Sequence, residues 1–484
     1  MPRANEISAP VRGFDGTIYA FWQSKMLFGL NRYSRRRFGK ETRMLLALAL
    51  PMMSAQIAAV GVGVVDTAMA GGAGKDDLTA VALGTSVFVT LLVTFIGIMN
   101  ALNPMIAQQY GAGERENIGE TARQGLWFGL ALGTAGMLGM WLAIRPLQAY
   151  LNMTEAVETM LGDYVFYTAL ALPAAMLYRA LYAYASSLGK TQAIMWISWA
   201  ALLLNIPFNY VFVYGKLGMP AMGGAGCGVA TALVFWFNAA ALWLYVSKAR
   251  FFAPFALTAR FSRPDKTVLK QIWQLGWPIG FSYFLEVSLF SFIVWLIARL
   301  GEDTVAAQQI TLNIGSITYM VPSAIGAAAT VRVGYCVGLR RFEQARYVSG
   351  VTLALSVGAA AVCMAVLLLL RGVLPQFYTN DADVMAIAAQ LLVLCAVMQL
   401  FDFIQCAASY ALRGYKITRG PMLIHAVAFW GLGLLPGWWL AYGVADMGIY
   451  GFWTALIGSL AAAAVALVWY LARCSDWAAR HRAL

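Results

Sequence analysis

Twelve apolar segments of membrane-spanning length follow one another between residues 44 and 472. A transmembrane helix needs about 20 predominantly apolar residues. The sequence therefore predicts an all-α integral membrane protein with twelve transmembrane helices. The predicted spans are 44–70, 78–104, 122–144, 157–178, 191–213, 226–247, 271–298, 304–330, 347–370, 383–411, 420–442 and 448–472.

The composition and the placement of the basic residues agree with this topology and give it an orientation. Apolar residues make up 61% of the chain and charged residues only 12%, about half the charged share of soluble domains. Of the 34 lysines and arginines, only five lie in the predicted outer loops, so both termini are predicted to lie in the cytoplasm, with the chain in a bacterial inner membrane. The net charge of +12 then reflects topology and lipid headgroups, and no nucleic-acid partner is expected.

The two halves of the chain repeat each other in the same orientation. Pro51 and Pro278 are 227 residues apart, and GVATAL (228–233) corresponds to GFWTAL (451–456). A parallel repeat predicts two six-helix lobes related by a pseudo-two-fold axis normal to the membrane, with a cavity between or within them. The predicted organisation is a basic cytoplasmic tail (1–40), an N-lobe (41–247), a cytoplasmic linker (248–270), a C-lobe (271–472) and a C-terminal cytoplasmic tail (473–484).

Three carboxylates lie well inside predicted spans, namely Asp66, Glu286 and Asp402. We expect no interior cation beside them, because the lysines and arginines stand at span ends, where their long side chains can reach the interface. An unpaired ionised carboxylate is costly to bury, so the sequence predicts a partner that comes and goes: a proton, a metal cation or a cationic cargo. A permanent interhelical hydrogen bond is the alternative for each acid. Asp402 also belongs to a polar stripe on one helix face, formed by Gln399, Asp402, Cys406, Ser409 and Arg413.

Two asparagines one helical turn apart indicate a candidate ion site. Asn205 and Asn209 share a helix face, and Pro207 between them frees a backbone carbonyl nearby. Together with Asp66 they offer enough oxygens for a hard monovalent cation such as Na⁺. The alternative is that the amides only hold helices together, and the similar NALNP (100–104) is interpreted as mostly structural because it ends a span.

Other chemistries lack their usual residues. The chain has no GxxxxGK[ST] loop for ATP, no Ser/His/Asp set, and only two histidines, too few for a histidine-based site. Its six cysteines form no CxxC pair and are expected to be small buried hydrophobic residues. The chain is therefore predicted not to be an enzyme and to hold no resident cofactor, Na⁺ or H⁺ being transported ions.

Five segments together resemble the multidrug and toxic compound extrusion family, in its bacterial NorM-type branch. They are VDTAMAGG (65–72), LNIPFNYVFVYGKLG (204–218), GAGCGVATALV (224–234), FLEVSLF (284–290) and YALRGYK (410–416), and the resemblance extends from about residue 41 to about 470.

The resemblance implies a secondary active efflux transporter that exports organic cations and other amphipathic drugs in exchange for Na⁺ or H⁺ by alternating access. It implies that Asp66, Asn205 and Asn209 form an ion site in the N-lobe. Glu286 and Asp402 match C-lobe acids implicated in ion coupling and drug binding, and Gln309 and Asp381 stand where relatives contact drugs near the outer mouth. The sequence departs from family patterns at Met398, where relatives carry a tyrosine, and at Cys227, where some carry a threonine. The expected partners are cationic or amphipathic small molecules and membrane lipid, with the protein as a monomer.

Two other functions fit a two-lobed membrane protein less well. A flippase for lipid-linked precursors would need a strongly cationic cavity, which the interior acids argue against. A channel or structural membrane protein would not need three buried acids distributed over two lobes.

Overall fold

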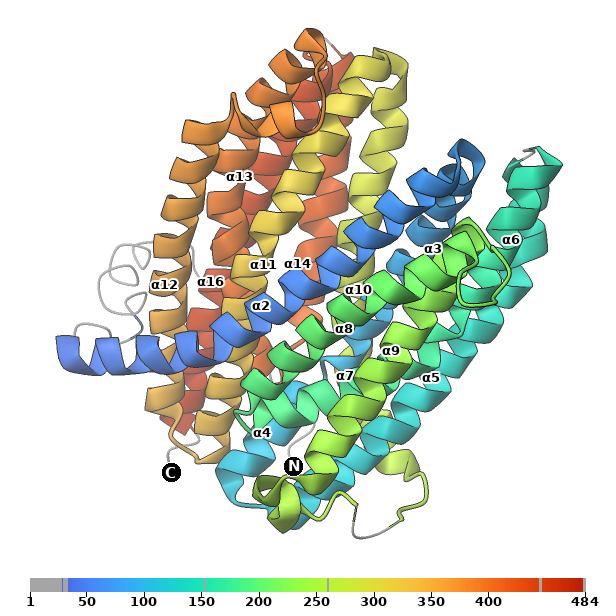
Figure 1. The fold of residues 1–484 in the computed structure, drawn as a ribbon. Helices are drawn as coiled ribbons and strands as arrows, with labels where there is room; N and C mark the ends of the chain where they lie inside the picture. Colours follow the sequence, from blue (N-terminus) through green and yellow to red (C-terminus); the bar gives the residue numbers. More distant parts are fainter. Residues whose placement is uncertain (1–27, 29–33, 152–153, 259–260, 444–445, 482–484) are drawn as a thin grey trace.

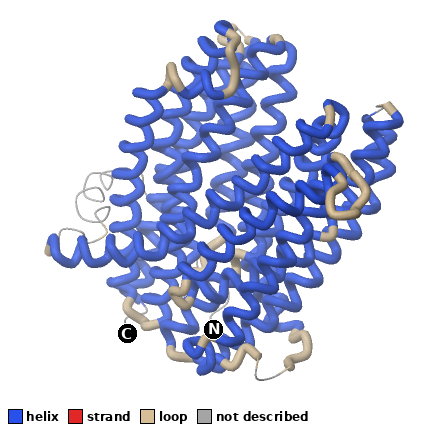
Figure 2. Tube along the Cα trace, in the orientation of Figure 1, coloured by secondary structure: helices blue, strands red, loops and turns tan. Residues whose placement is uncertain are grey.

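The computed structural model describes residues 28, 34–151, 154–258, 261–443 and 446–481, so most of the predicted N-terminal tail lies outside the described residues. Within them every regular element is a helix, and none is a strand (Figure 2). Twelve spans are long and apolar enough to cross a membrane, judged by length and composition. The predicted all-α class and the predicted number of spans are therefore confirmed.

The first half of the chain contributes six of these spans, two of which are interrupted. Pro104 and Pro173 each stand in the first turn that follows an interruption, where the missing proline N–H leaves one helical hydrogen bond unmade. The helices are α2 (Arg35–Ala73), α3 (Lys75–Met99), α4 (Leu102–Ala112), α5 (Arg115–Leu151), α6 (Glu155–Ala169), α7 (Ala171–Ser187), α8 (Thr191–Tyr214) and α9 (Gly224–Lys248).

The second half contributes the other six, and its fifth span changes helix type. A π-helical segment, Val427–Leu434, separates two short α-helices in that span. The helices are α10 (Lys266–Ile297), α11 (Glu302–Gly338), α12 (Phe342–Leu370), α13 (Ala382–Gly414), α14 (Arg419–Ala426), α15 (Leu435–Tyr442) and α16 (Ile449–His481).

The two halves form two lobes that share a core at one end only. One apolar cluster contains residues of the first half alone, and a second cluster contains residues of the second half alone. A third and larger cluster combines both halves, with Leu45 and Ile106 from the first and Val333 and Tyr347 from the second. Figure 1 shows the lobes spreading apart toward the end that carries the predicted outer loops. The shared core thus closes the predicted cytoplasmic end.

The lobes meet along close helix crossings. Helix α10 packs against α3, and α11 packs against α2 and α4. A Cβ atom placed on Gly97 of α3 would lie 2.7 Å from the Cα atom of Gly280 on α10, so only glycine allows these backbones to approach so closely. An ion pair also joins the lobes, since Arg332 of α11 contacts buried Glu41 of α2 at 3.0 Å.

The linker between the lobes is held against α5. Gln124 of α5 donates a hydrogen bond to the Arg263 carbonyl oxygen (2.8 Å), and Trp127 donates to that of Ser262 (2.9 Å). Helix α10 already begins at Lys266, inside the predicted linker 248–270. Helix α16 continues to His481, through most of the predicted tail 473–484.

Candidate functional site

A cavity of about 910 Å³ lies between the lobes. Both halves line it, but the second half supplies its carboxylates, Glu286 from α10 and Asp402 from α13, together with Gln309 and Gln399. The structure thus brings Glu286, Asp402 and Gln309 to one cavity.

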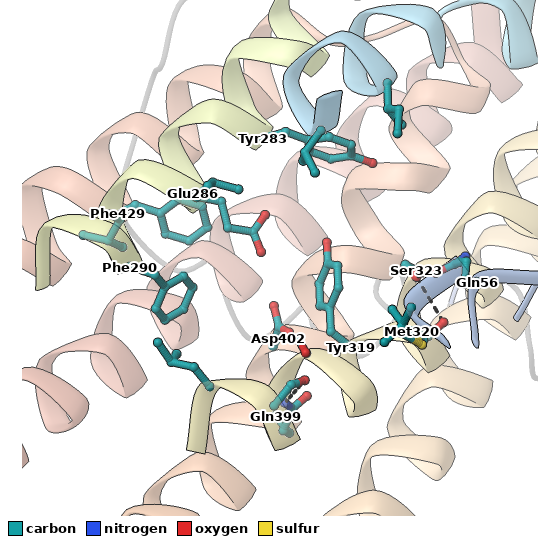
Figure 3. Close-up of a pocket in the computed structure, with 18 of the residues that line it drawn as sticks. Gln56, Tyr283, Glu286, Phe290, Tyr319, Met320, Ser323, Gln399, Asp402 and Phe429 are labelled. Carbon is teal, nitrogen blue, oxygen red and sulfur yellow. Dashed lines mark hydrogen bonds between the residues drawn. The ribbon is translucent and has the colours of Figure 1, made fainter. Parts of the chain in front are cut away.

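Glu286 and Asp402 point into the same part of this cavity, beside the ring of Tyr319 (Figure 3). Within the described residues neither carboxylate takes part in an ion pair. Asp402 is 7% exposed and its Oδ1 accepts a hydrogen bond from Gln405 (2.9 Å). No hydrogen bond to Glu286 is found among the described residues, so its carboxylate is available to bind a ligand in the cavity.

Two arginines also line the cavity, so the expectation of an interior without cations is wrong. Arg413 is 4% exposed, its guanidinium lies 4.0 Å from the ring centroid of Tyr410, and it donates a hydrogen bond to Tyr283 (2.9 Å). Arg179 donates to Asn100 (3.3 Å). The sequence analysis placed Arg413 at the end of a span. In the structure α13 continues to Gly414 and its last turn is buried between the lobes, so the Arg413 side chain cannot reach the membrane–water interface.

The third acid, Asp66, belongs to a separate site inside the N-lobe. Asn205 (3.0 Å) and Asn209 (2.6 Å) donate to its Oδ1, and Thr231 donates to its Oδ2 (2.6 Å). None of these four side chains lines the cavity. The structure thus brings Asp66 of α2 together with Asn205 and Asn209 of α8.

The orientation of the amides differs from that expected for a cation site. The amide nitrogens, not the oxygens, face Asp66, and Asn209 Oδ1 is buried without a partner among the described residues. Rotation of that amide would present an oxygen next to the carboxylate, so the site has the ligands for Na⁺ but holds them turned away. Thr231 was missed by the sequence analysis. Thr231 lies one turn after Cys227 on α9, a position that the sequence analysis had singled out, and Cys227 donates a hydrogen bond to the Asp66 carbonyl oxygen (3.4 Å).

Asp381 lies outside the cavity lining, at the start of α13 in a predicted outer connection, and its carboxylate accepts hydrogen bonds from the backbone N–H groups of Asp383 and Val384. Asn100 and Asn103, interpreted as mostly structural, both line the cavity. The break between α3 and α4 turns them there.

A buried hydrogen-bonded chain behind Asp402 was not predicted. Gln405 lies three residues after Asp402 on α13, and its Oε1 lies 2.9 Å from Nε2 of His425 on α14. The i, i+3 spacing of Gln405 was a visible signal, but nothing in the sequence indicated that His425 would join it.

Comparisons with known proteins agree with the repeat and the fold. The MatE family model matches twice, at residues 51–211 and 278–439. The probable multidrug resistance protein NorM of Neisseria meningitidis is 59% identical over 450 residues, covering 93% of this chain and 98% of the relative. The multidrug resistance protein PmpM of Pseudomonas aeruginosa is 39% identical over 445 residues, covering 90% and 92%.

Solved structures are similar over the same length. The MATE transporter NorM-NG, solved in complex with rhodamine 6G and a monobody, is 55% identical with a TM-score of 0.78, covering 91% of this chain and 95% of that one. The eukaryotic MATE transporter AtDTX14 has a TM-score of 0.83 at 20% identity, covering 92% and 99%, which is a likeness of fold. The relatives are named as multidrug resistance proteins and transporters, which are not enzymes, in agreement with the sequence analysis.

Proposed function

The chain belongs to the MatE family as a multi-pass multidrug efflux transporter, and we propose that it exports organic cations and other amphipathic drugs in exchange for Na⁺ or H⁺. The observation that carries this proposal is the pair of carboxylates, Glu286 and Asp402, which face one cavity between the lobes without an ion-pair partner among the described residues. The complex of a relative with rhodamine 6G supports a cationic cargo.

The charge on these acids provides the coupling. An ionised carboxylate away from water is stabilised by a cation, and a cationic drug or a proton can fill that role, but both cannot do so at once. Each species therefore weakens the binding of the other, and this mutual effect is reciprocal by linkage. Entry of the ion from the outer side releases the drug, after which the lobes rock and a new drug loads from the inner side.

The N-lobe site adds a second place for the coupling ion. Asp66, Asn205 and Asn209 are the proposed ligands if that ion is Na⁺, and Asp66 is the acceptor if it is H⁺. Because these residues do not line the cavity, an ion there would act on the drug through the packing of α2 and α8 rather than by direct competition.

The proposed setting is a bacterial inner membrane, with both termini in the cytoplasm and the protein acting as a monomer surrounded by lipid. Gln309 is a proposed drug contact because it lines the cavity, and Asp381 is a proposed contact at the outer start of α13, outside the cavity lining. The comparisons favour multidrug export over a lipid-linked precursor flippase.

The test is dye efflux from proteoliposomes under separately imposed Na⁺ and proton gradients. Glu286→Gln should reduce export of a cationic dye by at least about tenfold, because a charge–charge interaction in a partly desolvated site is lost. Glu302→Gln, at the exposed start of α11, is the matched control and should export like the wild type. Wild-type export by Glu286→Gln under every gradient would remove this acid from the mechanism.

A further inference from the structure

His425 is buried behind Asp402 and does not line the main cavity. It is 5% exposed and its ring stacks on Phe429 with the planes 1° apart. Its Nε2 faces Oε1 of Gln405, and Nε2 of Gln405 donates to Oδ1 of Asp402, each pair 2.9 Å apart. A histidine from α14 is thus two hydrogen bonds away from a carboxylate that faces the cargo.

The direction of this chain follows from the donors available. The N–H of Gln405 is committed to Asp402, so the carbonyl end of the amide faces His425, and the ring must donate from Nε2. Nδ1 has no partner among the described residues, and a proton there would be an unpaired buried N–H, so the arrangement favours a neutral ring protonated at Nε2 alone.

The reversed arrangement is worse on two counts. A reversed amide would present its oxygen to Asp402, which is repulsive unless the acid is protonated. His425 would then have to accept at Nε2 and carry its proton on Nδ1, where the buried N–H would lack an acceptor. An orphan buried N–H is rarer than an acceptor left unfilled, so the histidine opposes the reversed amide.

We propose that His425 is a positioning residue for Asp402: through Gln405 it keeps an N–H group on the carboxylate, and so favours the ionised, cation-binding form. This inference depends on the proposed function, because it assigns a role in cation capture. Hydrogen bonds in series polarise one another in the same direction, which strengthens the bond that reaches Asp402. Without the histidine, the amide of Gln405 is free to turn its oxygen toward a protonated Asp402.

Other ionisable groups surround this chain, and any pH profile includes their effect. They come from each helix packed around it and are Tyr283 and Glu286 on α10, Tyr319 on α11, Cys406, Tyr410 and Arg413 on α13, and Tyr470 on α16, which contacts Gly420 of α14. All of them are kept in the variants below, so a change on altering His425 or Gln405 reports on the chain itself.

The first experiment reads the tautomer of His425 directly. The chain has only two histidines, so ¹⁵N-histidine labelling of a His481→Gln variant of the full chain leaves a single ring to observe by NMR. The expected pattern is a protonated Nε2 and an unprotonated Nδ1. An Nδ1–H tautomer or an imidazolium in the dye-free protein would overturn the proposal.

The second experiment measures binding of the cationic dye rhodamine 6G to the purified protein across pH. His425→Phe keeps a flat ring but removes the donor, and should move the pH midpoint of dye binding upward by about 0.5–1 unit, the size expected for one net hydrogen bond. Gln405→Leu should give the same shift, and the double variant no more than either single one, because all three break one chain.

Two further variants separate positioning from structure. His425→Gln supplies an amide N–H near the Nε2 position and should restore a midpoint close to the wild type. Ser459→Ala removes a buried hydrogen bond to Ala428 (2.7 Å), close to His425 but outside the cavity lining, and should not move the midpoint. If His425→Phe does not fold, the NMR measurement of the His425 tautomer still decides.

The outcomes distinguish this inference from the proposed function. If the wild type neither binds nor exports the dye, the proposed function fails. If the wild type binds and exports it, but folded His425→Phe keeps the wild-type midpoint, or the shifts of the two single variants add, only the positioning role is overturned.

Discussion

At the scale of the residue, the three buried acids are satisfied in different ways. Asp66 accepts hydrogen bonds from three side chains, Asp402 from one, and for Glu286 none is found among the described residues. A buried carboxylate is stabilised by such donors in place of water. The N-lobe acid is therefore held in a preformed site. The carboxylates of the two C-lobe acids have oxygens that remain available to bind a ligand in the cavity.

Thr231→Val should test the N-lobe site, because it removes the one side-chain donor to Asp66 Oδ2 found in the described part of the chain, with little change of shape. We expect a loss of about 1–3 kcal/mol in stability and weaker ion-driven efflux, with dye affinity retained because Thr231 does not line the cavity. Thermal unfolding and dye binding of the purified protein measure both effects.

The matched control is Thr352→Val, whose buried hydroxyl bonds only to the Val348 carbonyl in its own helix among the described residues. Equal losses of stability in the two variants would mean that the hydroxyl on Asp66 has no special weight.

At the scale of the element, the crossing of α3 and α10 between the lobes is a close approach of two glycines beside a helix break. Gly97 on α3 lies against Gly280 on α10, and the helix break at residues 100–101 follows one turn later. Close backbone packing of this kind holds helices together in a membrane, where apolar side chains gain nothing by leaving lipid. The crossing thus joins the lobes next to Asn100, which lines the cavity.

Gly97→Ala should destabilise the protein by about 1–3 kcal/mol through overpacking at this crossing. The control is Gly358→Ala on α12, where an added Cβ meets nothing within 4 Å, so only the favourable helix propensity of alanine, up to about 1 kcal/mol, should be felt. Thermal unfolding in detergent compares the two. An unchanged or raised unfolding temperature for Gly97→Ala would show that α3 and α10 are not in contact here.

At the scale of the whole molecule, closure is confined to one end. The mixed core and the Glu41–Arg332 ion pair join the lobes at the predicted cytoplasmic end, while the separate cores leave the other end apart. Gln344 adds a hydrogen bond to Glu41 (3.2 Å). For alternating access, these contacts must break when the cavity opens to the cytoplasm.

Arg332→Gln should favour that opening, because removing one partner of a buried ion pair costs about 3–5 kcal/mol of the state that contains it. Cys336, fully buried in the mixed core one turn after Arg332, reports on the change. In a variant with the other five cysteines replaced, a thiol reagent should label Cys336 faster when Arg332 is changed.

Arg480→Gln is the control, since its ion pair with Asp476 is on an exposed arginine (59%) and such pairs contribute little. If Cys336 reacts at the same rate in all three proteins, the ion pair does not hold the lobes closed.

The sequence by itself determined the number of spans, the repeat and the positions of the acids. Each of these depends on local quantities, namely the length of an apolar run, the distance between matching residues and the rarity of a charge within oil. The pairing of Asp66 with Asn205 and Asn209 was also accessible, because the one-turn spacing of the amides is local and the motif resembled a known family.

Only the tertiary structure decided which side of each helix faces lipid, the protein interior or the cavity. Lipid and protein interior are both apolar, so a membrane helix lacks the polar face that reveals orientation in a soluble protein. For that reason the structure alone separated Asp66 from the cavity, kept Arg413 inside and placed His425 behind Asp402.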